Sequence, residues 1–162
     1  MEEYASENRI PIIGKTGAAL LGEVVGRKQP LFVLEIGTAI GYSAILIAAN
    51  SFSAHIVTIE QDVERIAAAK RFIEKSGFEQ RIKIVAGDAG QLVSGLPGPY
   101  DFVFIDAAKG QYLDYLTKIL DKLMPGSVIA ADNVSFRGMV TGKAAVPKRY
   151  RTIVKRLKQY LE

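Results

Sequence analysis

The chain has 162 residues, of which 49% are hydrophobic and 23% charged, and its formal net charge is +4. These values are typical of one globular domain with a single core, and they exclude a disordered or fibrous protein. The absence of cysteine and the single histidine, His55, exclude disulfides, thiolate nucleophiles and zinc sites built on Cys or clustered His. A metal would need oxygen ligands, which favours magnesium, calcium or manganese. Because no apolar run is long enough for a bilayer and no signal peptide is evident, we expect a cytoplasmic protein without a membrane partner.

Helical spacing alternates with short apolar runs along the chain, beginning with a helix at 15–25 that Gly26 is expected to end. Runs rich in β-branched and aromatic residues predict buried strands at 31–36, 55–59, 81–85, 101–105 and 127–131. Helices are predicted between them at 43–49, 62–75, 89–94 and 111–123, and after them at 148–160. This alternation predicts a single α/β domain, residues 1–162, with a doubly wound, mainly parallel sheet.

Polar side chains stand at the ends of the predicted strands, at the edge where a doubly wound sheet binds its ligands. They are Glu35, Glu60, Asp88, Asp106, Asp132 and Asn133. A carboxylate is costly to bury without a partner, so several at one edge predict hydroxyls, amines or a cation in the crevice. The alternative is that these acids only cap the helices that follow them.

The first strand runs into a glycine loop, in which Gly37 and Gly41 allow a ligand to approach the backbone before a helix begins. The G-x-x-x-G spacing differs from the G-x-G-x-x-G that seats a pyrophosphate, which argues against a dinucleotide and an NAD-linked oxidoreductase. Glu60, at the end of the next strand, can accept both hydroxyls of a ribose. Asp88, after the third strand, can meet an adenine amine.

Five segments in order resemble the motifs of the cation-dependent O-methyltransferases, the family of the catechol and caffeoyl-CoA enzymes. They are residues 35–43, 58–60, 87–89, 104–109 and 131–134. Within this family, residues 8–13 and 109–112 are most similar to the bacterial branch that methylates 5-hydroxyuridine in tRNA. The resemblance covers residues from about 8 to 160 and implies a Rossmann-like class I methyltransferase fold. It also implies two cofactors, S-adenosylmethionine and Mg²⁺, with Mn²⁺ or Ca²⁺ as alternatives to Mg²⁺.

The resemblance further implies roles for individual residues. Cofactor contacts fall on Ile13, Glu35, Gly37, Thr38, Tyr42, Ser43, Glu60, Asp88, Ala89 and Asp106. Metal ligands fall on Asp106, Asp132 and Asn133. Lys109 falls on the catalytic base or charge stabiliser, and Asp106 belongs with it to the catalytic pair. The alternative for Lys109 is an exposed lysine at a helix start.

The implied function is Mg²⁺-dependent methylation of 5-hydroxyuridine in tRNA. Small catechol-like or caffeoyl-CoA-like phenols are the alternative acceptors, since they too present two adjacent oxygens to one cation. A second alternative is a non-catalytic nucleotide-binding or RNA-binding module. Tyr42, Tyr112 and Phe136 are candidates either for stacking on an aromatic acceptor or for packing. Arg137, Lys143 and Arg149 either grip a phosphate backbone or are simply solvated.

The chain also departs from the family pattern, which has additional helices at its start and two more strands at its end. Without those strands, the strand that delivers Asp132 and Asn133 should leave an apolar edge open. We therefore expect either that the 162 residues are a form shortened at both ends relative to the family, or that a partner molecule covers this edge. The oligomeric state stays open, with a homodimer as one option.

Overall fold

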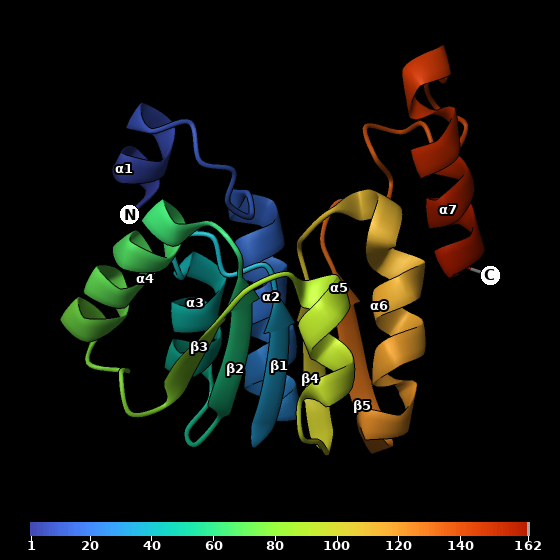
Figure 1. Ribbon diagram of the computed structural model, residues 1–162. Coiled ribbons are helices and arrows are strands. Elements are labelled where there is room, and N and C mark those ends of the chain that lie inside the picture. Colours follow the sequence, from blue (N-terminus) through green and yellow to red (C-terminus); the bar gives the residue numbers. More distant parts are fainter. Residues whose placement is uncertain (162) are drawn as a thin grey trace.

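The sheet has five parallel strands in the order β3-β2-β1-β4-β5, in a computed structural model that describes residues 1–161 (Figure 1). The strands are β1 Phe32–Ile36, β2 His55–Glu60, β3 Ile82–Ala86, β4 Tyr100–Ile105 and β5 Leu123–Ala131. The chain reverses its direction of winding between β1 and β4, and this switch point is where such sheets bind ligands. The predicted α/β doubly wound fold is confirmed.

Helices cover both faces of this sheet. The α-helices are α1 Glu2–Glu7, α2 Lys15–Lys28, α3 Tyr42–Asn50, α4 Val63–Ser76, α5 Ala89–Leu92, α6 Tyr112–Ile119 and α7 Arg151–Leu161. Single 3-10 turns are η1 Val93–Gly95, η2 Lys109–Gln111, η3 Leu120–Lys122 and η4 Lys148–Tyr150. Figure 1 shows α4 at the β3 end of the sheet and α7 beyond α6 at the β5 end.

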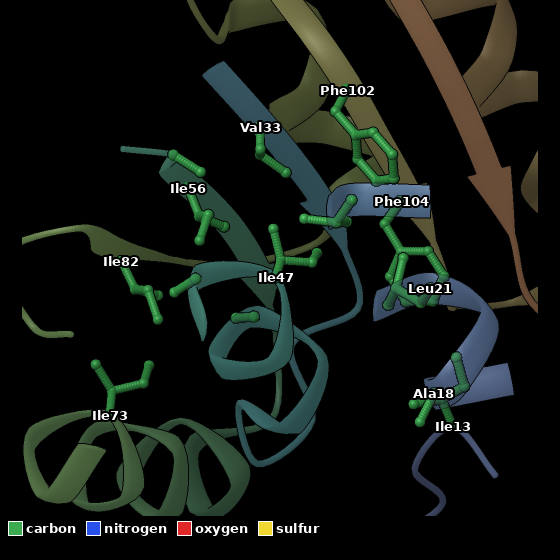
Figure 2. Close-up of a cluster of buried hydrophobic side chains, with 14 of the residues drawn as sticks. Ile13, Ala18, Leu21, Val33, Ile47, Ile56, Ile73, Ile82, Phe102 and Phe104 are labelled. Carbon is green, nitrogen blue, oxygen red and sulfur yellow. The ribbon is translucent and has the colours of Figure 1, made fainter. Parts of the chain in front are cut away.

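Each central strand is buried on both faces because its side chains alternate between two apolar layers. In β1, Val33 belongs to a cluster with residues of α2 and α3, whereas Leu34 and Ile36 belong to a second cluster with residues of α6 and α7. Figure 2 shows the first cluster, in which Leu21 and Ile47 face the strands. Burying one such side chain stabilises the fold by about 1.5–3 kcal/mol, so these layers hold the strand ends in place.

The prediction that Gly26 ends the leading helix was wrong, because α2 continues to Lys28. The side-chain amide of Gln29 donates a hydrogen bond to the Gly26 carbonyl (2.8 Å) and another to Asn50 O (3.1 Å). Gln29 itself adopts the left-handed conformation (φ 47°) and supplies the C-cap that glycine was expected to supply. The short helix α1 was not predicted.

β5 begins at Leu123, earlier than the predicted residue 127. Ser127 fixes this extension, because its Oγ donates to Tyr100 O (2.8 Å) and accepts from Met124 N (2.8 Å). Within residues 1–161, β5 pairs only with β4. The expected open edge on the strand that precedes Asp132 is therefore present in this part of the chain.

Candidate active site

A cavity of about 450 Å³ lies at the carboxyl edge of the sheet. It is lined by residues that follow all five strands, together with the segment that leads into α2. The predicted site residues on its wall are Ile13, Gly37, Thr38, Tyr42, Ser43, Glu60, Asp88, Ala89, Asp106, Lys109, Asp132 and Asn133. Among the predicted site residues only Glu35 is not on the wall, and it is completely buried.

The glycine loop passes tightly over the ends of β1 and β4. Gly37 has φ 104°, and a Cβ at this position would lie 2.2 Å from the carbonyl oxygen of Asp106. The backbone amides of Gly37 and Thr38 both donate to Ile59 O (3.1 Å each). Since only glycine tolerates this conformation and this approach, the loop can follow the floor of the cavity closely.

Glu60 fixes the loop from the end of β2. Its Oε2 accepts a hydrogen bond from Ala39 N (2.9 Å), and its Oε1 accepts from Gln61 N (3.0 Å) and Asp62 N (3.1 Å). These backbone donors hold the carboxylate in one orientation at the cavity wall. Each carboxylate oxygen keeps acceptor capacity for a ligand hydroxyl.

Helix capping explains part of the acidic edge. Asp88 accepts from Gln91 N (3.1 Å) as the N-cap of α5, so it caps a helix and also lines the cavity. Asp62, which was not among the predicted site residues, caps α4 in the same way. Capping does not account for Glu60, Asp106 or Asp132, which make no such helix-cap bond.

Glu35 lies beneath the loop and, like Val33, points to the α2 and α3 side of the sheet, opposite to Leu34 and Ile36. Its Oε2 accepts from the Thr58 hydroxyl (2.5 Å), and Thr38 Oγ1 lies 2.6 Å from Thr58 Oγ1. Glu35 Oε1 is buried without a hydrogen-bond partner in the described residues. Burial raises the pKa of Glu35 to about 7, although hydrogen bonding by the side chains of Ser43 and Thr58 opposes the rise.

The other end of the cavity combines Lys109 with two carboxylates. Lys109 Nζ lies 3.5 Å from Asp106 Oδ1, and it donates to Tyr112 OH (3.1 Å) and to the backbone oxygen of Asp132 (3.3 Å). The Tyr112 hydroxyl donates in turn to the same Asp132 oxygen (3.1 Å). Burial raises the pKa of Asp106, Lys109 opposes that rise, and the nearby Asp132 adds to it. Lys109 is therefore a partly buried group within the site rather than an exposed lysine.

This end of the site has the donors that a hard cation needs. Asp132 faces the start of α2, since a Cβ at Gly17 would lie 3.5 Å from Asp132 Oδ1. Asn133 follows with a left-handed φ of 54° and lines the same cavity. No cluster of three His, Cys, Asp or Glu residues suited to a metal occurs in residues 1–161, so the amide of Asn133 would have to be the third ligand. Two mutually repelling carboxylates and an amide oxygen fit Mg²⁺.

The sequence analysis missed several residues of the wall, chiefly Pro11, Arg65, Gln111 and Tyr115. Arg65 lies in the first turn of α4, and Gln111 accepts a hydrogen bond from the Tyr115 hydroxyl. Proximity to the recognised motifs was the only signal for them. The position of α1 gave no signal either, although Glu2 accepts a hydrogen bond from Tyr42 OH (2.8 Å) at the edge of the cavity.

Most of the aromatic and basic residues that the sequence suggested for contact with the acceptor lie outside the cavity or are buried in packing. Tyr112 is fully buried and packs edge-on against Tyr160. Of the two alternatives for this residue, the structure therefore supports packing rather than stacking on a ligand. Phe136 packs in the same manner against Tyr150, outside the cavity wall. The side chains of Arg137, Lys143 and Arg149 are exposed, and none of them lines the cavity.

The parallel sheet, the glycine loop and the acid at the end of β2 define a class I nucleoside-cofactor domain. The chain belongs to the O-methyltransferase family, whose sequence profile matches residues 7–162. No helix within residues 1–161 combines the length and the apolar character needed to pass through a membrane.

Sequence and structure comparisons with individual proteins support this family membership. A protein of Mycobacterium tuberculosis is 34% identical over 150 residues, which are 85% of this chain and 64% of the relative. A catechol O-methyltransferase of Niastella koreensis is 38% identical over 113 residues, 67% of this chain and 51% of the relative. The chain thus spans about half to two thirds of the length of these relatives. An O-methyltransferase of Bacillus cereus, solved in complex with SAH, superimposes with a TM-score of 0.84 at 27% identity, covering 98% of this chain and 74% of the other.

Proposed function

We propose that this chain transfers the methyl group of S-adenosylmethionine to an acceptor hydroxyl that lies beside a second oxygen, and that the acceptor is 5-hydroxyuridine in tRNA. One observation carries the proposal. A single cavity has Glu60 and the glycine loop at one end and Lys109, Asp106 and Asp132 at the other. One cavity with these groups would hold a nucleoside cofactor and an acceptor oxygen next to each other, as methyl transfer requires.

The cofactor end acts by positioning. Glu60 accepts the ribose hydroxyls, Asp88 and Ala89 meet the adenine, and the amides around Gly37 leave room for the methionine part. Glu35 supports this loop from below through Thr58 and Thr38. Because Glu60 is held by three backbone donors, little side-chain entropy is lost when the ribose binds.

The acceptor end handles the proton and the charge. In the reaction, the bond between the methyl carbon and sulfur breaks as the bond to the acceptor oxygen forms, and sulfur keeps the electron pair as a neutral thioether. Lys109 takes the hydroxyl proton as an amine, or stabilises the oxygen anion as an ammonium after the proton leaves to water. Asp106, Asp132 and Asn133 would hold a divalent cation, which stabilises the deprotonated form of the acceptor when it is bound.

Two other functions give different results in one assay. The protein is incubated with methyl-labelled S-adenosylmethionine and either tRNA that carries 5-hydroxyuridine or a catechol, with and without a chelator. We expect labelled tRNA, loss of label with chelator and recovery with added Mg²⁺. Label in the catechol alone would favour the small-phenol alternative. Cofactor binding without any turnover, unaffected by Lys109→Ala and Asp132→Ala, would favour a non-catalytic nucleotide-binding or RNA-binding module.

A further inference from the structure

Positive charge is concentrated at one end of the molecule. Residues 133–161 contain eight basic residues and no acidic one, whereas the whole chain has a net charge of only +4. Within residues 1–161, the ion pairs all lie outside α7. By contrast, the exposed face of α4 mixes Lys70, Arg71 and Lys75 with Glu64 and Glu74. A charged face without internal partners indicates a surface for an anionic ligand.

Three of these cations share one face of α7 and line a groove. Arg151, Lys155 and Lys158 are spaced i, i+4 and i+7, and their side chains line a groove of about 510 Å³ together with Val146, Val154 and Gln159. At 1.5 Å per residue, the three positions span about 10 Å along the helix. Val154, which lines the groove, is also buried in the cluster that α7 shares with α6, so the groove lies next to that contact.

This groove is coupled to the cavity through the loop that carries Lys109. Arg156 Nη1 donates to the carbonyl of Gly110 (3.0 Å), the residue directly after Lys109. Tyr160 of α7 packs against Tyr112, whose hydroxyl binds Lys109 Nζ. Figure 1 shows α7 beside α6, at the end of the sheet that delivers Asp132. A ligand in the groove would therefore approach the cavity from its acceptor end.

We propose that the groove formed by Arg151, Lys155 and Lys158 binds the phosphate backbone of an RNA acceptor and so presents one of its nucleotides to the cavity. This inference rests on the proposed function. The span of about 10 Å corresponds to roughly three steps from one phosphate to the next along one strand, at about 3.4 Å of axial rise each. The eight basic residues of 133–161 exceed what the few phosphates of a coenzyme A thioester would use, which favours a polymer. Contacts to phosphates position a nucleic acid on a protein without reading its sequence.

The test combines Arg151→Gln, Lys155→Gln and Lys158→Gln in one variant. The matched control replaces Lys70, Arg71 and Lys75 of α4 by glutamine, which removes the same charge from an exposed face away from the groove. Binding of a fluorescent RNA stem-loop is measured over a range of salt concentrations, with coenzyme A as competitor. Methyl transfer is then compared between 5-hydroxyuridine in RNA and a catechol. Circular dichroism and thermal melting establish that both variants fold.

We expect the α7 variant to bind the stem-loop at least tenfold more weakly. Its salt dependence should fall by about 2 in log–log slope, at about 0.7 for each phosphate that the protein no longer neutralises. KM for RNA rises, transfer to the catechol is unchanged, and the α4 control behaves like the parent. Equal RNA binding by the α7 variant and the control would overturn the proposal, as would displacement of RNA by coenzyme A at stoichiometric concentration. RNA binding through α7 without methyl transfer to any acceptor would support the groove while contradicting the proposed function.

Discussion

The two ends of the cavity are constructed in different ways. At the cofactor end, backbone amides hold the functional groups, as when Ala39, Gln61 and Asp62 fix the carboxylate of Glu60. At the acceptor end, side chains hold one another, since Lys109 is positioned by Asp106 and Tyr112. Backbone donors are fixed by the fold, whereas a side-chain network depends on each of its members. We therefore expect substitutions at the acceptor end to lower the rate with little effect on cofactor affinity, and substitutions at the cofactor end to do the reverse.

The largest effect is expected for Lys109→Met, which removes the cation from the acceptor end. General acid–base groups contribute typically 10²–10⁴-fold, so the methyl-transfer rate should fall by roughly that factor. Cofactor affinity, measured by titration calorimetry, should stay within about threefold because the hydrogen bonds of Lys109 Nζ go to Asp106, Tyr112 and Asp132 rather than to the glycine loop or Glu60. Lys75→Met, at an exposed position of α4, should match the parent in both measurements. A loss of cofactor affinity as large as the loss of rate would remove the distinction between the two ends.

The next effect is expected for Gly37→Ala, which alters the glycine loop where it crosses the backbone of Asp106. The new Cβ would lie 2.2 Å from a backbone oxygen at φ 104°, so the loop must move, at a cost of about 3 kcal/mol. Cofactor affinity and melting temperature should both fall. Gly95→Ala is the control, because nothing lies within 4 Å of a Cβ there. Parent-like cofactor affinity in Gly37→Ala would contradict the close approach of ligand and loop.

A smaller effect, dependent on pH, is expected for Glu35→Gln. The pKa of Glu35 rises from 4.5 to about 7 on folding, so its stabilising contribution is complete below pH 4.5 and is lost as the pH passes 7. One pKa unit corresponds to about 1.4 kcal/mol, which limits the change to about 3 kcal/mol. Denaturant unfolding from pH 4 to 9 should therefore show the parent losing stability relative to the variant as the pH rises. If the stabilities of parent and variant change with pH in the same way, Glu35 is not the group whose pKa rises on folding.

The sequence made the cofactor end predictable because its determinants are local. The loop from Gly37 to Gly41 and the acid Glu60 stand directly after strands that their apolar runs reveal. Asp106 and Asp132 could be predicted as site residues for the same reason, since each directly follows a predicted strand. A residue that comes directly after a strand must lie at the end of that strand, so the sequence pattern alone gives its position in the sheet.

The acceptor end was predictable only in part, because long-range packing decides it. Tyr112 looked like an aromatic residue at a helix start, and only the meeting of η2, β5 and α7 reveals that its hydroxyl joins Lys109 to Asp132. The groove of α7 depends on Val146 and Arg151 coming together across the turn η4. Neither arrangement follows from the spacing of residues along the chain.

The smallest effect is expected for Tyr112→Phe, which tests whether this hydroxyl positions Lys109. The substitution keeps the ring in its packing against Tyr160 but removes the group that accepts from Lys109 Nζ and donates to Asp132 O. A hydrogen bond to a charged group contributes about 1.5 kcal/mol, so kcat should fall roughly tenfold while KM for the cofactor is unchanged. Tyr160→Phe is the matched control, since the Tyr160 hydroxyl makes no side-chain hydrogen bond in residues 1–161. If both variants lose kcat equally, the packing of α7 rather than the Tyr112 hydroxyl holds the lysine, and the acceptor end depends on the fold as the cofactor end does.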